Sequence, residues 1–345
     1  MNIFEGRESK LAGFKERQEF VDFLPTADEK TMPSHCVLCG KKVNSLCHSH
    51  SVPKMVLKEI AKDGKVLLAN SVFGISGFDV YKHTKKAGIF HVICPECDSK
   101  VFQDYENSNN LIHTPTDKMM TEIALKNSLH QLRKRQMEIY IIDHADPPFD
   151  PLFRQQQIIQ KKQQIKELNE DIDFYKTTLN NNKHNRFTIV CYKKLPYKAP
   201  IAVETEFDLP TDMKNNPINI FSPKKMQTRV QFIHLCVFPL HNETIVLMFY
   251  HNRDKKYASF NNQFNEFPED KALMYLNWII FKYTENYFFS VQVNNAITNN
   301  KNLQMLSQEY NGRPCFGIGV PEAFEGFRYI QPYEIPNFLD IKHRL

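Results

Sequence analysis

Two pairs of cysteines, each with a two-residue gap, constrain the fold of this chain more than any other feature of its sequence. They are Cys36 and Cys39, in CVLCG, and Cys94 and Cys97, in CPECD, with 54 residues between the pairs. A two-residue gap lets both thiolates of a pair face one ion, and Gly40 permits the tight turn after the first pair. Four thiolates complete a tetrahedral shell with no open position, so we predict one structural zinc ion.

Other interpretations of these cysteines are weaker. A redox CxxC needs only one pair and usually stands in a βαβ pattern, which surrounds neither pair here. An iron–sulfur cluster uses the same ligand type, whereas four unrelated buried thiols would not share a matched spacing. The remaining cysteines are single and are predicted to be core residues: Cys47, Cys191, Cys236 and Cys315.

Length and composition predict a cytoplasmic protein of two or three domains. The 345 residues are 42% hydrophobic and 24% charged, which is the ordinary range for a globular protein. The net charge of +5 permits a polyanionic partner without requiring one. The first residues are polar and charged, and no run approaches the roughly 18 apolar residues of a membrane span, so we expect no secretion, no membrane partner and no disulfides.

Changes in the hydrophobic pattern divide the chain into four parts and predict an α+β fold. Residues 1–35 form a lead-in segment, residues 36–115 a zinc-bound module, residues 116–185 a helical arm and residues 186–345 an α+β domain of unknown role. Inside the zinc module, SVPKMVLKEIAKDG predicts a short helix that ends at Gly64, and KVLLANSVFGI and AGIFHVI predict strands.

The helical arm is predicted to contain two helices. The first begins at Thr116, a suitable N-cap, and runs to Met137, with a basic run at its end. The second spans about 152–180 and has apolar residues every seven positions, at Ile158, Ile165, Ile172 and Leu179. Three heptads make a short coiled-coil seam, and we favour packing on the same chain over a homodimer or another protein partner through residues 158–179.

The C-terminal part predicts an antiparallel sheet with a covering helix. Apolar and β-branched runs are separated by Pro and Asn turns, in RFTIVCYKKL, IAVETEF, VQFIHLCVFPL and ETIVLMFYH. The segment EDKALMYLNWIIFKYTENYFFS has the longer apolar spacing of a helix. His234, His241 and His251 are predicted to be structural, and NGRPCFGIGVPEAFEG to be a turn region rather than a phosphate loop.

Two histidines stand between the cysteine pairs, in CHSHSVPKM. If this segment is an extended strand, its side chains alternate between two faces. His48 and His50 then lie on one face, and Cys47, Ser49 and Ser51 on the other. A lone histidine is more often structural, but two imidazoles on one face can point together toward a substrate. The sequence therefore marks this ribbon as a candidate site.

The order of these motifs resembles the HNH-like, ββα-metal endonucleases. A CxxC pair is followed by SHSVPK and then by a second pair that opens CDSKVFQDYEN, as in bacterial members with an SHxxPK pattern. The resemblance covers about residues 36 to 110. It implies a treble-clef fold in which zinc holds a hairpin and a helix together, with one divalent cation, Mg²⁺ or Mn²⁺, beside a general-base histidine.

The resemblance also implies roles for particular residues. His50 would deprotonate the attacking water, and Asp98 would supply a hard oxygen ligand to the divalent cation. Ser49 stands where these nucleases often have a metal-binding aspartate, and His48 could compensate for it. The asparagine that orients the base has no clear counterpart, since His91 is a weak substitute.

Helical spacing after the second cysteine pair would place Asp98, Phe102 and Glu106 on one side, so that Asp98 and Glu106 face one cleft. Alternatively, Asp98 only favours the helix N-terminus through the helix dipole. Basic residues are candidates for contacts with phosphates. They are Lys54 and the run Arg133, Lys134 and Arg135, with Lys41, Lys42, Lys82, Lys85 and Lys86 as further members.

Three functions are consistent with these features. The leading hypothesis is a metal-dependent endonuclease that hydrolyses phosphodiester bonds in DNA, or in RNA, as part of a bacterial anti-phage defence system. The second is a catalytically inactive, zinc-stabilised module that binds nucleic acid or protein, which Ser49 and the missing asparagine favour. The third is an interaction scaffold built on the seven-residue seam and the β-rich domain.

Overall fold

The computed structural model describes residues 23–68, 80–144, 150–181, 185–219, 229–294, 297, 299–311 and 330–345. Cys315 and nearly all of the predicted turn region lie outside these residues. The first part of the chain contains β1 (Ser49–His50), α2 (Lys54–Ile60), β2 (Lys65–Leu68), β3 (Val80–His83), β4 (Ile89–Phe90), α3 (Pro95–Val101), α4 (Ser108–Leu111), α5 (Asp117–His144) and α6 (Pro151–Asn180). The second part contains β5 (Phe187–Leu195), β6 (Ile201–Phe207), β7 (Ile233–Pro239), β8 (Thr244–His251), α7 (Tyr257–Asn265), α8 (Glu269–Tyr283), β9 (Tyr287–Ser290) and α10 (Lys301–Asn311).

A seven-stranded antiparallel sheet is the centre of the fold, in the order β3-β2-β9-β6-β7-β8-β5. Its edge strand β3 and its neighbour β2 come from the predicted zinc module, and Val66 of β2 pairs with Ser290 of β9. Residues 36–115 and residues 186–345, which the sequence assigns to separate parts, therefore contribute strands to one sheet. The architecture is mixed α and β.

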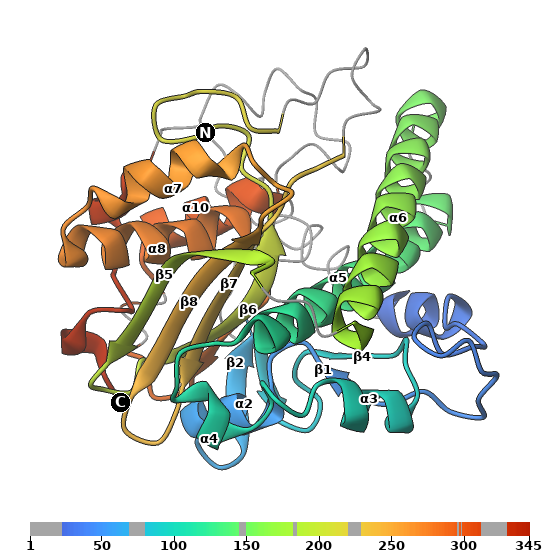
Figure 1. The fold of residues 1–345 in the computed structure, drawn as a ribbon, viewed down its shortest axis with the longest axis horizontal. Helices are drawn as coiled ribbons and strands as arrows, with labels where there is room; N and C mark the ends of the chain where they lie inside the picture. The colour runs from blue at the N-terminus through green and yellow to red at the C-terminus, as the bar shows by residue number, and fades with distance from the viewer. Residues whose placement is uncertain are drawn as a thin grey trace, which may run out of the picture.

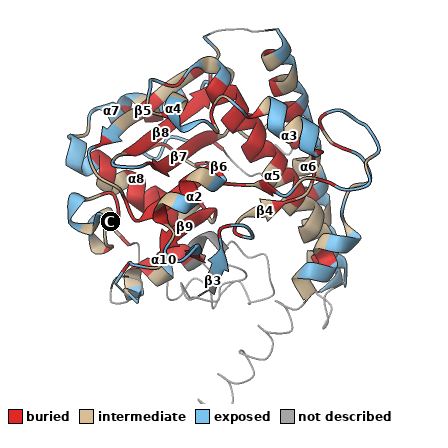
Figure 2. Cartoon of the chain, turned by 90° about the horizontal axis from the view of Figure 1, so that it is seen from below, coloured by how far each residue is buried: buried red, intermediate tan, exposed pale blue. Residues whose placement is uncertain are grey.

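Helices cover both faces of this sheet (Figure 1). Alternation along β6 shows how the faces divide: Ile201 and Val203 join the core beneath α7, α8 and α10, whereas Ala202 joins the core shared with α2 and α5. The central strands are buried throughout, as the red strands in Figure 2 show. A sheet buried on both faces explains why β7 and β8 are apolar along nearly their whole length.

The seven-residue seam of α6 packs against α5 of the same chain (Figure 1). Leu168, Ile172 and Tyr175 are almost fully buried. Lys161, which interrupts the apolar pattern, is tolerated because its ammonium lies 2.8 Å from the carboxylate of Glu138 on α5. The buried part of the seam thus faces a helix of its own chain.

The four predicted C-terminal strands and both helices of the arm are confirmed. The hydroxyl of Thr116 accepts a hydrogen bond from the Met119 amide at 3.2 Å, as expected of an N-cap. However, α5 continues to His144, seven residues beyond the predicted end at Met137. The basic run Arg133–Gln136 therefore lies within the helix and not at its end.

Two predicted helices are too long. Residues 269–290 are not one helix: α8 ends at Tyr283, and Tyr287–Ser290 form β9 near the middle of the sheet. Aromatic residues suit a pleated strand that is buried on both faces. Likewise α2 ends at Ile60, and Gly64, with φ of +70°, belongs to the turn before β2. Among the described residues, no helix has the length and apolar character needed to cross a membrane.

Candidate functional site

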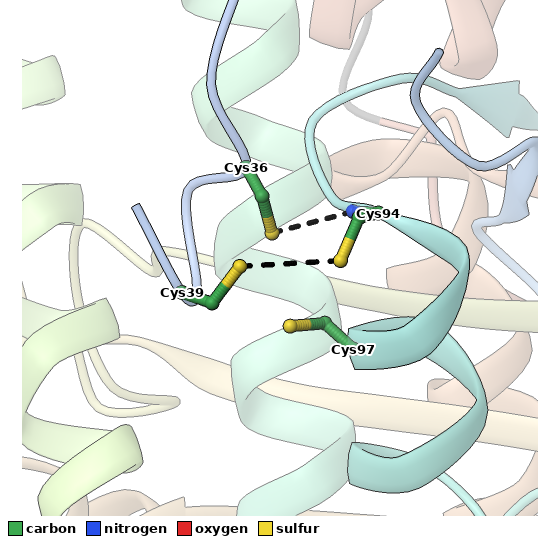
Figure 3. A group of neighbouring side chains, drawn as sticks. All are labelled: Cys36, Cys39, Cys94 and Cys97. Carbon is green, nitrogen blue, oxygen red and sulfur yellow. Dashed lines mark hydrogen bonds between the residues drawn. The ribbon is translucent and has the colours of Figure 1, made fainter. Parts of the chain in front are cut away.

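Four cysteine sulfur atoms converge as the sequence predicts (Figure 3). The Sγ atoms of Cys36, Cys39, Cys94 and Cys97 all lie within 4.8 Å of one another, and those of Cys39 and Cys94 are 4.0 Å apart. Sulfur ligands at about 2.3 Å from a tetrahedral zinc ion lie about 3.8 Å from one another. The cluster can hold a metal ion, and its ligand set is consistent with structural zinc.

Short local turns aim each pair at the cluster. The Gly40 amide donates to the Cys36 carbonyl at 2.8 Å, and Gly40 has φ of +71°, a conformation that glycine adopts without strain. Cys94 precedes α3, and Cys97 lies in its first turn. The Cys94 amide donates to Cys36 Sγ at 3.3 Å and so links the two pairs.

Burial and the neighbouring thiols raise the pKa of Cys97. Several thiolates in such close contact need a compensating positive charge, which a bound metal ion supplies. Cys47 is not part of the cluster, because its thiol donates to Asp98 Oδ2 at 3.5 Å. Cys191 and Cys236 are buried core residues, as predicted.

The histidine segment lies on β1, which pairs antiparallel with β4, although α2, β2 and β3 stand between these two strands in the chain. Ser49 pairs with Phe90 and His50 with Ile89. The turn before β4 needs glycine at position 88, where φ is +63° and a Cβ would lie 2.5 Å from Ser51 Oγ and 2.8 Å from the ring of Phe288. This close approach holds the β1–β4 pair against β9.

His50 is held as a neutral base. Its Nε2 lies 2.9 Å from the carbonyl oxygen of Thr84. Because a carbonyl oxygen can only accept, Nε2 carries the proton and Nδ1 of the neutral ring keeps its lone pair. Burial lowers the pKa of His50 below its ordinary value of 6.5, and the charges of Lys54 and Lys126 act in the same direction, while the Thr84 hydrogen bond and Asp98 oppose them. The ring is therefore neutral at pH 7.

His48 has different partners from His50. Its Nδ1 lies 2.9 Å from Nε2 of His91, and the two rings meet edge to face. Nδ1 of His91 in turn lies 3.5 Å from a carboxylate oxygen of Asp28. His91 thus orients His48 and not His50. The group that orients His50 is a backbone carbonyl, which any residue supplies, so no side-chain pattern in the sequence could have revealed it.

Asp98 and Glu106 converge on a single partner, the ammonium group of Lys126. Lys126 Nζ lies 3.0 Å from Asp98 Oδ1 and 3.0 Å from Glu106 Oε1, and 3.9 Å from the centre of the Phe102 ring. Only 1% of Lys126 is exposed. The Ser49 hydroxyl donates to Asp98 Oδ1 at 2.7 Å. The acidic residues and the histidine ribbon are therefore joined through Asp98.

These ion pairs keep the groups charged. Burial disfavours the ammonium form of Lys126, but the carboxylates of Glu106 and Asp98 outweigh that effect and raise its pKa. Burial would also raise the pKa of Asp98, but Lys126 and the Ser49 hydroxyl outweigh it and lower the pKa. At neutral pH Lys126 is consequently protonated and Asp98 is ionised.

Lys126 belongs to a stripe of charged residues on α5 that the sequence interpretation missed. Lys118, Glu122 and Lys126 are spaced by four, so they share one side of the helix. Lys118 Nζ binds Asp104 at 2.8 Å, and Glu122 Oε2 accepts from the amides of Asp104 and Tyr105 at 3.2 and 3.0 Å. The signal in the sequence is this regular spacing of charges within an otherwise apolar helix.

The residues implied as ligands of a catalytic divalent cation do not fit one here. Mg²⁺ and Mn²⁺ require several oxygen ligands, at about 2.0–2.2 Å. Both oxygens of Asp98 already have partners, Lys126 and Ser49 on Oδ1 and Cys47 on Oδ2, and a fixed ammonium opposes a second cation. Apart from the four cysteines, the described part of the chain contains no group of three His, Cys, Asp or Glu side chains placed to hold a metal.

The basic run on α5 makes contacts within the chain. Arg133 is 2% exposed, and its guanidinium binds the side chain of Asp28. Lys134 and Arg135 both form ion pairs with Glu138, one turn further along the helix. The prediction that these three residues contact phosphates therefore receives no support from their placement.

The other predicted phosphate contacts lie at the surface. Lys54 is exposed at the first residue of α2, and its charge acts on His50. Exposed lysines also flank Thr84, whose carbonyl binds His50. The further members of the predicted set are exposed as well: Lys41, Lys42, Lys82, Lys85 and Lys86.

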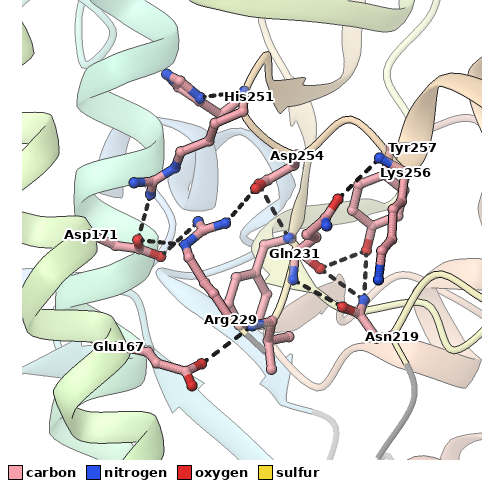
Figure 4. Close-up of polar contacts among 12 residues, drawn as sticks. Glu167, Asp171, Asn219, Arg229, Gln231, His251, Asp254, Lys256 and Tyr257 are labelled. Atoms are coloured by element: carbon pink, nitrogen blue, oxygen red, sulfur yellow. Dashed lines mark hydrogen bonds and ion pairs between the residues drawn. The ribbon is translucent and has the colours of Figure 1, made fainter. Parts of the chain in front are cut away.

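A second cluster of charged side chains fastens α6 to the sheet (Figure 4). Nε and Nη2 of Arg229 each lie 3.2 Å from a carboxylate oxygen of Asp171 on α6. Arg229 also binds Asp254, and Arg253 also binds Asp171. The two carboxylates are 2% and 1% exposed. Each buried charge thus has a partner, and the cluster has a structural role.

His234 and His251 lie in the adjoining core. Burial lowers the pKa of each to about 3, so both imidazoles stay neutral. The ring of His234 stacks on Phe249, and that of His251 meets Phe187 edge to face. Their placement agrees with the predicted structural role, whereas His241 is exposed in the turn between β7 and β8.

We expect the purified protein to contain one zinc ion per chain, measured by inductively coupled plasma mass spectrometry. Cys39→Ser should lose that zinc and lower the melting temperature, because the metal ties residues 36–39 to α3. Cys47→Ser is the matched control, since Cys47 contacts Asp98 and not the cluster. Unchanged zinc content in Cys39→Ser would contradict the site.

Asp171→Ala should destabilise the fold, because it leaves two guanidinium groups short of a buried partner. We expect a loss of about 3 kcal/mol in the free energy of unfolding, near the low end for a broken buried pair because Arg229 and Arg253 are partly exposed. Asp173→Ala, on the same helix, removes only an exposed ion pair with Lys176 and should cost less than about 1 kcal/mol. Urea denaturation of both variants compares the losses, and equal losses would refute the role of Asp171.

Comparison of the chain with protein-family models, with curated proteins and with solved structures finds no match. None of these comparisons identifies it as a member of the HNH-like nucleases that its motifs resemble.

Proposed function

We propose that residues 36–110 form an HNH-like, treble-clef nuclease module that cleaves phosphodiester bonds in nucleic acid, with His50 as the general base. The observation that carries this proposal is the state of His50. Its Nε2 donates a hydrogen bond to the Thr84 carbonyl oxygen, so the lone pair of Nδ1 can accept a proton. On resemblance alone, we extend the proposal to a role in bacterial anti-phage defence, and the polar start of the sequence leads us to propose a cytoplasmic location.

The order of elements in this region supports the proposal. A cysteine turn at residues 36–39 precedes β1, which carries His50, and β4, the antiparallel partner of β1, precedes Cys94 and α3. Between β1 and β4 the chain also forms α2, β2 and β3. Apart from these three elements, this is the order that the resemblance implies for a ββα-metal module held by zinc. Asp98, the residue after the second pair, is joined to β1 through the hydroxyl of Ser49.

The chemistry assigned to His50 is proton transfer. Its Nδ1 takes the proton of the hydroxyl group that attacks phosphorus, and such general-base catalysis contributes about 10²- to 10⁴-fold in rate. The exposed lysines around it, Lys54, Lys82, Lys85 and Lys86, would attract the phosphate backbone and make binding weaker at high salt.

A second candidate is a zinc-stabilised module that binds nucleic acid or protein without cleaving it. The observation that favours it is the ammonium of Lys126, which occupies the carboxylates that a catalytic cation would need. In that case His50→Ala would bind nucleic acid with the same salt-dependent affinity as the wild type, and neither protein would cleave it.

We expect the wild-type protein to cleave nucleic acid and His50→Ala to be at least about 10²-fold slower, because the variant lacks the proton acceptor. Plasmid DNA and a structured RNA serve as substrates, with cleavage followed on gels. His241→Ala is the matched control, an exposed histidine in the turn between β7 and β8. Equal rates in the wild type and His50→Ala would remove His50 from the mechanism.

The rate should stay high as the pH falls through 6.5, the ordinary pKa of histidine. The active form is neutral His50, and its pKa is lowered, so the ring protonates only at more acidic pH. Lys54→Gln removes one charge that lowers this pKa and should move the acid limb of the pH–rate profile to higher pH. An acid limb above pH 6.5 in the wild type would be the opposite result.

A further inference from the structure

The position of Lys126 relative to the candidate site is unusual for a lysine. Its ammonium touches Asp98, the residue that the resemblance offers as the metal ligand, and Glu106, the other acidic residue of the same segment. Asp98 is itself bound to Ser49, the neighbour of His50 on β1. Lys126 therefore places a positive charge beside the carboxylates that the resemblance offers to a catalytic cation.

Lys126 is fixed in this position. Its Nζ lies between two carboxylates and over the Phe102 ring at 3.9 Å. It is carried by a 28-residue helix whose neighbouring residues Ile123 to Leu125 are fully buried. A lysine that is 1% exposed cannot swing aside into solvent without breaking both ion pairs and opening the core.

We infer that Lys126 takes the place of the divalent cation in this module, so that the wild-type site binds neither Mg²⁺ nor Mn²⁺ and its substrate is RNA. The substrate assignment rests on the proposed nuclease function, whereas the occupation of Asp98 and Glu106 by Lys126 does not. The ammonium balances the charge of Asp98 and Glu106 as a metal ion would, but it has no coordination position for a water molecule.

That difference selects the substrate. A bound divalent cation activates water, whereas an ammonium group supplies only charge and hydrogen-bond donors. Without a metal ion to bind and activate water, the nucleophile that His50 deprotonates is best supplied by the substrate itself, beside the phosphorus atom. The 2′-hydroxyl of RNA meets this requirement, and DNA has no equivalent group.

The reaction balances without a metal. Nδ1 of His50 takes the proton of the 2′-hydroxyl, and the bond from the 2′ oxygen to phosphorus forms while the bond to the 5′ oxygen breaks. The 5′ oxygen takes a proton from solvent. The products are a 2′,3′-cyclic phosphate and a 5′-hydroxyl end, and the proton on His50 returns to solvent.

The first test measures Mn²⁺ binding to the zinc-loaded full-length protein, by electron paramagnetic resonance and by the melting temperature during a Mn²⁺ titration. Wild type and Lys126→Arg should bind no Mn²⁺ and show no shift. Lys126→Ala should be less stable but should gain a Mn²⁺-dependent rise in melting temperature, because Asp98 and Glu106 are released as ligands. Lys126→Gln serves the same purpose if the alanine variant fails to fold.

Two results would overturn the assignment of Lys126. One is a Mn²⁺ ion bound to the wild type and lost in Asp98→Asn, which would show that the cation and Lys126 coexist. The other is a folded, neutral Lys126 variant that binds no Mn²⁺, which would show that the two carboxylates do not form a cation position.

The second test compares RNA with DNA in buffer freed of divalent cations by a chelating resin. We expect the wild type to cleave RNA and to leave 2′,3′-cyclic phosphate ends, with DNA intact. The inference would be overturned if the protein cleaved DNA and needed added Mg²⁺ or Mn²⁺ to do so. No cleavage of either substrate would overturn both the proposed function and the RNA assignment, while the Mn²⁺ titration still decides the role of Lys126.

Discussion

The ammonium group of Lys126, enclosed between the carboxylates of Asp98 and Glu106, fixes the segment after the second cysteine pair to α5. Removing an ammonium ion from water costs several kcal/mol, and only close, well-placed carboxylates offset that cost. Lys118 and Glu122 hold the same segment at two further points along the helix. Because α5 is also packed against the sheet and α6, the candidate site is built on a rigid helix.

The candidate site is also tied to the central sheet. The Ser51 hydroxyl donates to the side chain of Asn286, whose amide nitrogen donates to the Glu204 carbonyl of β6 at 2.6 Å. Strand β2, which follows the histidine ribbon and α2, pairs with β9. Metal binding by the cysteine cluster and packing of the C-terminal strands would therefore stabilise one structure. Loss of a bound metal would lower the stability of the fold beyond the cysteine cluster, since metal binding and folding are thermodynamically linked.

Two parts of the site favour different chemistry. The geometry of His50 suits a general base, because a carbonyl oxygen fixes its tautomer and burial keeps it neutral. The surroundings of Asp98 do not suit a hydrated divalent cation, because hydroxyl, thiol and ammonium donors already occupy its oxygens. A nuclease that relies on its histidine and a binding module without catalysis are both compatible with this combination. Both differ from a metal-dependent enzyme in that the carboxylates of Asp98 and Glu106 are occupied by Lys126 and not by a cation.

Features that depend on a few neighbouring residues could be predicted from the sequence: the cysteine pairs, the Thr116 cap, the seven-residue seam and the four C-terminal strands. Each follows from local spacing or from a side chain that bonds its own turn. The tertiary structure alone decided that β2 joins β9, that Arg133 binds Asp28, that the Thr84 carbonyl orients His50 and that Lys126 meets Asp98. These contacts join segments 28 to more than 200 residues apart, and their free energy depends on burial and distance, which local sequence patterns do not specify.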